Sequence, residues 1–104
     1  MTVPPIDRED IRKQVGDSSL ARGFLYFQRR TIVDTRRRGS TLEARCWGTR
    51  DDAYRVKVQF GVSGIVGATC SCPVGAKGSC KHVAALLFAW LNHPDEFGEA
   101  VEAE

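Results

Sequence analysis

Apolar residues occupy every second position in two segments of the chain, residues 41–47 and residues 54–60. A period of two is the pattern of a β-strand that buries one face. Residues 31–38 begin with β-branched side chains, and residues 65–70 form a fourth candidate strand. Because short turns containing glycine separate these segments, we expect three or four consecutive strands in an antiparallel meander.

Two short helices are predicted before the strands. Asp7 can cap the first, with Asp10 three residues on as a variant of the capping box, and Gly16 can end it after about Val15. The second covers about residues 19–29, where apolar residues recur at every third or fourth position. The chain therefore begins with helical structure and then changes to strands.

A third helix is predicted at residues 81–92, and it is apolar around most of its circumference. Pro94 disfavours helical geometry at the residue before it and so marks the end of this helix. A helix that covers only one surface has a narrower apolar stripe. We therefore expect this helix to lie between two surfaces of the chain or, if Phe88, Trp90 or Leu91 is uncovered, to dock a protein partner.

The length of 104 residues favours one domain with a modest core. The pattern predicts an α+β fold with two N-terminal helices, a three- to four-stranded antiparallel sheet and a C-terminal helix. We divide the chain into a lead with a short helix (residues 1–18), a folded domain (19–94) and an acidic flexible tail (95–104). No apolar run is long enough to span a bilayer and no signal peptide is visible, so we expect a cytoplasmic protein.

Charge is unevenly distributed along the chain, although the net charge is only +2. The last ten residues hold five acidic residues and no Lys or Arg, which leaves 15 basic against 8 acidic residues in the first 94. A basic body of this kind is typical of contact with an anionic partner, whereas Lys and Arg also simply solvate protein surfaces. Charge alone therefore leaves both interpretations open.

Four candidate metal ligands lie within 13 positions: Cys70, Cys72, Cys80 and His82. Residues i and i+2 of an extended strand point to the same side, so the first two cysteines can converge on one ion. We expect Cys80 to precede the last helix and His82 to occupy its first turn, because two residues inside a helix face apart. Three sulfurs and one imidazole nitrogen suit tetrahedral Zn²⁺, and four protein ligands make such a site structural.

Other uses of these cysteines fit the pattern less well. A Cys70–Cys72 disulfide would be strained, and a reducing compartment disfavours it. A redox dithiol usually has two residues between its cysteines, and a nucleophilic Cys/His pair would leave two cysteines without a role. Cys46 lies on the apolar phase of a strand, so we expect a buried, inert thiol, and His93 at the helix end is expected to have no metal role.

The pattern Cys70-Ser-Cys72, seven further residues and then Cys80-Lys-His82 resembles the SWIM zinc finger motif, Cys-x-Cys followed by Cys-x-His. The upstream residues are similar to the region that precedes this motif in bacterial members, so the resemblance covers about residues 19–95. It implies a compact finger of strands and a helix, with zinc on these four residues. It also implies binding to DNA or to other proteins and an association with SWI2/SNF2-type ATPases. The phosphate-binding loop of such an ATPase is absent from the sequence.

Basic side chains cluster in the predicted strands and beside the metal loop. An arginine-lined sheet face with one exposed aromatic ring can follow a phosphate backbone and stack a base. The alternative is a solvated face on which the tryptophan covers a helix or the arginine stems, while the lysines offset the charge of the zinc centre. The candidate nucleic-acid-binding residues are Arg36, Arg37, Arg38, Arg45, Trp47, Arg55, Lys57, Lys77 and Lys81.

We therefore expect a zinc-binding interaction module without catalysis. The first hypothesis is contact with DNA or RNA through the arginines, which would allow association with the nucleoid. The second is a protein–protein interaction module of a SWI2/SNF2-type helicase or ATPase assembly, docked through the last helix. A third, an enzyme with a Cys/His pair, is removed if zinc binds all three thiolates. Neither a membrane nor a small-molecule substrate is expected among the partners.

Overall fold

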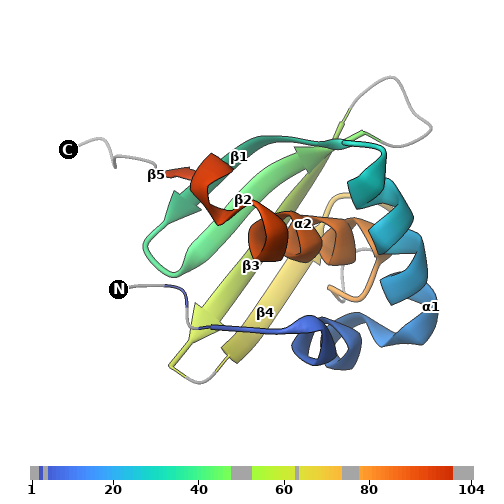
Figure 1. Cartoon of the computed structure of the whole chain (residues 1–104), viewed down its shortest axis with the longest axis horizontal. Coiled ribbons are helices and arrows are strands. Elements are labelled where there is room, and N and C mark those ends of the chain that lie inside the picture. Colours follow the sequence, from blue (N-terminus) through green and yellow to red (C-terminus); the bar gives the residue numbers. More distant parts are fainter. Residues whose placement is uncertain (1–2, 4, 48–52, 63, 74–77, 100–104) are drawn as a thin grey trace.

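The computed structural model describes residues 3, 5–47, 53–62, 64–73 and 78–99. This part of the chain forms two α-helices, one short 3-10 helix and a five-stranded sheet (Figure 1). In chain order the elements are α1 (Arg8–Gln28), β1 (Ile32–Arg38), β2 (Thr41–Cys46), β3 (Tyr54–Gly61), β4 (Gly64–Cys70), α2 (Lys81–Asn92), η2 (Pro94–Glu96) and β5 (Gly98–Glu99). Neither of the helices described is long and apolar enough to cross a membrane.

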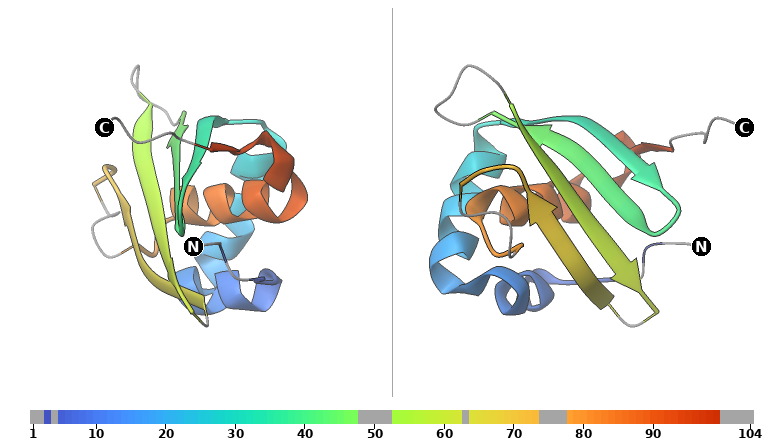
Figure 2. Two further views of the ribbon diagram at one scale, coloured as in Figure 1. Left: turned by 90° about the vertical axis from the view of Figure 1, so that its left-hand side faces the viewer. Right: turned by 180° about the vertical axis from the view of Figure 1, so that it is seen from behind.

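The sheet has the strand order β4-β3-β2-β1-β5. Strands β1 to β4 are an antiparallel meander, as the alternation predicts, and β5 pairs with β1 in parallel. Both α-helices lie on one face of the sheet, and no helix of the described residues lies on the opposite face (Figure 2). The α+β class and the predicted meander are confirmed, and the two helices cover one face of the sheet.

The sequence predicts two N-terminal helices, but the structure has one helix, α1, in their place. Its start agrees with that prediction, because Asp7 and Asp10 form a reciprocal capping box with N···O distances of 3.0 and 2.9 Å. Gly16 leaves helical geometry at φ +85°, but the chain resumes the helix directly after it. The sequence predicts two helices here, whereas the structure has one helix with a kink. Ile11 and Val15 lie in the same core as the strand residues, so the first half of α1 is part of the folded domain.

Helix α2 lies between α1 and the sheet, and all its residues from His82 to Ala89 are buried. The close approach to α1 depends on Gly23, because a Cβ there would overlap Ala84 and lie 2.8 Å from the backbone oxygen of Lys81. Phe88 is 4% exposed and contacts the rings of Phe24 and Phe27. The helix is therefore enclosed by its own chain.

Residues after α2 fold back onto the sheet. Phe97 is buried and packs edge-on against Trp90, with ring centroids 5.3 Å apart. The Thr35 hydroxyl donates a hydrogen bond of 2.8 Å to the backbone oxygen of Glu96, and the strand that follows pairs with β1. The sequence predicts a flexible tail from residue 95, but a buried aromatic side chain and the edge of β1 hold residues 95–99. Residues 100–104 lie outside the described part of the chain.

Candidate metal centre and basic sheet face

The four predicted metal ligands come together at the junction between the sheet and α2. One donor atom from each residue lies within 4.8 Å of the other three. All four residues are buried, with exposed fractions of 4% to 7%. The cluster consists of Cys70, Cys72, Cys80 and His82. Sequence spacing alone therefore identified a set of side chains that the fold gathers in one place.

The distances within the cluster fit a tetrahedral zinc site. With Zn–S of about 2.3 Å and Zn–N of about 2.0–2.1 Å, tetrahedral ligands lie about 3.5 Å apart for a sulfur–nitrogen pair and about 3.8 Å for two sulfurs. Nδ1 of His82 lies 3.6 Å from Sγ of Cys70 and 3.8 Å from Sγ of Cys80. Three sulfurs and one imidazole nitrogen are also the donor types that zinc prefers. The residues present fit a closed zinc site.

The geometry also assigns the histidine nitrogen that would bind the metal. Nδ1 of His82 faces the sulfurs, whereas Nε2 is buried and has no hydrogen-bond partner among the described residues. The ring lies against two tyrosines, with centroid distances of 5.4 Å to Tyr26 and 4.7 Å to Tyr54. Tyr26 on α1 and Tyr54 on β3 therefore limit the orientation of the imidazole ring. The sequence offered no signal for them, because they are distant from the motif along the chain.

Backbone contacts hold the first half of the motif at the end of β4. Cys70 is the register partner of Val56 in the β3–β4 ladder. One residue further on, the Ser71 N–H donates to the Arg55 carbonyl at 3.0 Å, and the Ser71 hydroxyl accepts from the Arg55 N–H at 2.9 Å. Sheet pairing thus continues past the first ligand and orients the Cys-x-Cys segment.

The second half of the motif is held by the returning loop and by the helix start. Cys80 is the N-cap of α2 in extended geometry, and His82 is the second residue of the helix, as the sequence predicts. Before them, Gly78 at φ +71° packs against the backbone of Ala68, and its carbonyl accepts a hydrogen bond of 3.0 Å from the Gln14 side chain. Helix α1, strand β4 and helix α2 therefore all contribute to the site.

The thiols of the cluster do not titrate alike. Hydrogen bonding from the Cys70 thiol lowers the pKa of Cys80 to about 4. The same hydrogen bond raises the pKa of Cys70 above its ordinary value, and burial of the thiol is a second, smaller cause. The two sulfurs thus share a proton, and binding of a metal cation requires that proton to leave.

Cys46 is buried but is not part of the metal cluster. It is 0% exposed on β2, and its sulfur lies 3.5 Å from the hydroxyl oxygen of Thr31. Burial raises the pKa of its thiol to about 11, so it stays protonated and unreactive at neutral pH. This agrees with the predicted inert thiol.

His93 lies beside Glu96, with 3.7 Å between Nδ1 and the carboxylate, and is not among the residues of the cluster.

The face of the sheet opposite the helices carries most of the predicted nucleic-acid-binding residues. In the β2–β3 ladder Arg45 pairs with Arg55, and Glu43 pairs with Lys57. Residues directly opposite each other in a ladder point to the same face, and the intervening residues on both strands are buried on the other side. We define the basic sheet face as the surface formed by Arg36, Arg38, Arg45, Arg55 and Lys57.

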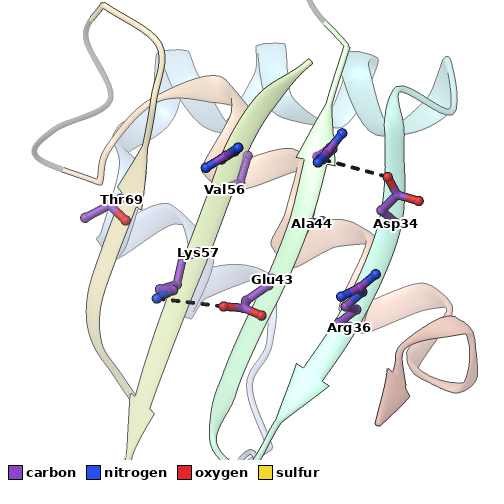
Figure 3. A pocket seen from close by; sticks show the side chains of 9 residues that line it. Asp34, Arg36, Glu43, Ala44, Val56, Lys57 and Thr69 are labelled. Carbon is purple, nitrogen blue, oxygen red and sulfur yellow. Dashed lines mark ion pairs between the residues drawn. The ribbon is translucent and has the colours of Figure 1, made fainter. Parts of the chain in front are cut away.

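Two carboxylates lie among these cations, and a groove of about 520 Å³ runs between them (Figure 3). Asp34 lies 3.9 Å from Arg45, and Glu43 lies 3.7 Å from Lys57 and 3.8 Å from Arg38. The side chains of these ion pairs are 29% to 61% exposed. Each pair therefore contributes only about 0–1 kcal/mol. Asp34 has φ +53° at the β-bulge in β1, and the sequence pattern gives no signal that it belongs to this surface.

Two of the predicted basic residues that the structure describes do not belong to this face. Arg37 pairs with the buried Leu42 and so lies on the side of the sheet that carries the helices. The ammonium of Lys81, the first residue of α2, lies 5.0 Å from the ring centroid of Tyr26 on α1, so it belongs to the helix side of the sheet. Lys77 lies outside the described residues. Among the described residues, Arg37 and Lys81 therefore lie apart from the other predicted nucleic-acid-binding residues.

Comparison with known proteins supports the metal centre. The family model of the SWIM zinc finger matches residues 54–91, a range that contains all four ligands, β3, β4 and nearly all of α2. The predicted resemblance is confirmed over this range, whereas the upstream segment that we also expected to match lies outside it. No curated protein and no solved structure shows significant similarity to the chain.

Proposed function

With a SWIM zinc finger at residues 54–91 as the premise, we propose that this protein is a zinc-stapled binding module that contacts nucleic acid through its basic sheet face. The observation that carries the proposal is the composition of that face, where five cations surround two carboxylates. No helix covers it in the described part of the chain. A positively charged surface attracts the phosphate groups of a nucleic acid, and binding releases the counterions that surround those phosphates.

The metal centre supports binding rather than catalysis. Four protein ligands leave no coordination position for a substrate, so zinc would act here as a structural ion. When bound, it supplies a tetrahedral crosslink between β4 and α2. A fixed junction at the end of β4 supports the position of its ladder partner β3, which carries Arg55 and Lys57 of the basic sheet face.

The alternative function, docking of a SWI2/SNF2-type ATPase or another protein through the last helix, has lost the observation that motivated it. The apolar residues of α2 are packed between α1 and the sheet, and Trp90 and Leu91 are only partly exposed. Phe24 and Leu25 on α1 are 40% and 50% exposed, but Phe24 also packs on Phe88. The charge of the sheet face is the stronger support.

The proposal is tested by titrating labelled DNA and RNA with the zinc-loaded protein at 50 mM and 200 mM salt, with fluorescence anisotropy as the readout. We expect affinity to fall steeply with salt, with a slope of about −0.7 to −0.9 for each phosphate contact in a plot of log K against log salt. An Arg45→Ala/Arg55→Ala double variant is expected to bind at least tenfold more weakly and with a shallower salt dependence.

The matched control is Arg12→Ala/Lys13→Ala, which removes two exposed charges from α1 on the helix side. An equal loss of binding in this control would show that only net charge matters. Binding that does not change with salt, or that survives the sheet-face substitutions, contradicts the proposal.

A further inference from the structure

The basic sheet face ends at an exposed tryptophan. Trp47 follows β2, and its N–H donates to the Thr31 carbonyl at 2.9 Å, which extends the β1–β2 ladder by one residue. Cys46 points into the core, so the alternation places the Trp47 side chain on the same side as Arg45. Its side chain is 46% exposed. An aromatic ring is therefore available beside the cations of this face.

The spacing of these groups matches one nucleotide. Trp47 and Arg45 are two residues apart on an extended strand, a distance of about 6.5 Å along the strand. Arg45 and Arg55 stand directly opposite each other, so their side chains begin about 5 Å apart. Two like charges in this position repel each other, and a shared anion removes that repulsion. A base stacked on the tryptophan would carry its phosphate within reach of both arginines.

The shape of the face favours a single strand over a duplex. Both described helices lie on the other side of the sheet, so neither one is presented to a DNA groove from this face. Bases inside a duplex are already stacked and paired, which leaves nothing for an exposed tryptophan to stack on. Asp34 and Glu43 also interrupt the cations, and a flexible single strand can route its phosphates around these carboxylates more easily than a rigid duplex.

We propose that this face binds single-stranded nucleic acid in preference to duplex, with one base stacked on Trp47 and the adjoining phosphate held by Arg45 and Arg55. This inference rests on the proposed function, since it names the kind of nucleic acid that the same face accepts. Base stacking on an aromatic side chain contributes about 1–3 kcal/mol per base, which corresponds to roughly 5- to 150-fold in affinity.

The chain contains only two tryptophans, which makes the test direct. In a zinc-loaded Trp90→Phe protein, Trp47 is the only indole, and the phenylalanine keeps a ring against Phe97. We titrate this protein with a ten-nucleotide oligothymidylate and with a ten-base-pair duplex at the same salt. The expected result is strong quenching of Trp47 fluorescence by the single strand, with tenfold weaker binding and little quenching by the duplex.

Substitutions at the tryptophan provide a second, independent measurement. In the otherwise unchanged chain, Trp47→Phe is expected to keep affinity for the single strand within about threefold, whereas Trp47→Ala loses about tenfold or more. If a Trp47 variant fails to fold, protection of Trp47 from iodide quenching in the zinc-loaded Trp90→Phe protein gives the same information. Binding of the single strand without any change at Trp47, or equal binding of the duplex, overturns this inference and leaves the proposed function standing. No binding of either DNA overturns this inference, and no binding of DNA or RNA in the salt titration above overturns the proposed function as well.

Discussion

At the scale of single residues, the metal loop depends on a glycine that the ligand motif does not include. Gly78 has φ +71°, and a Cβ built on it would overlap the carbonyl oxygen of Ala68. Gly39 has a similar φ of +61° in the turn between β1 and β2, but a Cβ there would meet nothing within 4 Å. The two positions separate the cost of a left-handed backbone from the cost of a steric overlap.

We predict that Gly39→Ala lowers the free energy of unfolding by about 1–2 kcal/mol, the cost of a left-handed alanine. Gly78→Ala adds an overlap with backbone and is expected to cost about 1–3 kcal/mol more. It also displaces the loop that leads to Cys80, so zinc affinity falls. Urea unfolding and zinc competition with a chromogenic chelator measure the two effects. Equal behaviour of the two variants would show that the loop adapts freely around Ala68.

At the scale of elements, the packing of α1 on α2 encloses the most apolar helix of the chain. The helices approach closely at Gly23, where a side chain would meet Ala84 and the backbone of Lys81. The rings of Phe24 and Phe27 then cover Phe88 from α1. Because α2 also begins at the metal centre, the same helix pair positions His82 through its contact with Tyr26.

Gly23→Ala gives a prediction in which two physical effects have opposite signs. Helix propensity alone would make alanine more stable than glycine by about 1 kcal/mol. The overlap with α2 instead predicts a loss of about 1–3 kcal/mol. We expect the loss, measured by urea or thermal unfolding of the zinc-loaded protein.

The exposed Ser18→Ala on the same helix is the control, and it is expected to be neutral or slightly stabilising, since no packing opposes the gain in propensity. A stabilised Gly23→Ala protein would mean that α1 and α2 can move apart without penalty.

At the scale of the whole molecule, zinc would connect the two layers of a small domain. The ligands come from the end of β4, the loop after it and the first turn of α2. The binding free energy of structural zinc reaches about 10–16 kcal/mol in zinc-finger peptides, which is comparable to the stability of a whole domain of this size. The site thus holds the sheet against the helix layer at the end opposite Phe97.

We predict that removal of zinc with a strong chelator, or Cys80→Ser, largely unfolds residues 65–92. Circular dichroism is expected to lose much of the helical signal, and amide exchange in β4 and α2 is expected to accelerate. Zn²⁺ should restore the signal after chelation, whereas Mg²⁺ should not, because three thiolates do not suit a hard cation. Cys46→Ala, which changes a buried cysteine outside the cluster, is expected to retain one equivalent of zinc. A native helical signal after verified zinc loss would contradict this prediction.

Local patterns predicted much of this protein because each depends on residues close together along the chain. The period of two in residues 41–47 and 54–60 sets which strand residues are buried, and the capping pair at Asp7 and Asp10 sets where α1 begins. The Cys-x-Cys and Cys-x-His spacings are equally local. An extended strand end and a helix start bring each pair into convergent positions, so the metal ligands are readable from the sequence alone.

The tertiary structure decided what depends on distant residues. Whether α2 is buried or exposed depends on α1, and residues 95–99 are ordered because Phe97 reaches Trp90 and β5 reaches β1. A bulge in β1 shifts the register of this strand. The face of the sheet on which Arg36, Arg37 and Arg38 lie therefore cannot be predicted by alternating residues from the start of the strand. Two N-terminal helices were expected where one kinked helix occurs, because a glycine can bend a helix whose two halves share one core. The sequence by itself thus determined the metal ligands and the buried face of β2 and β3, because both depend on neighbouring residues. Long-range packing decided the enclosure of α2 and the pairing of β5, and the bulge in β1 decided which of its arginines lie on the open face.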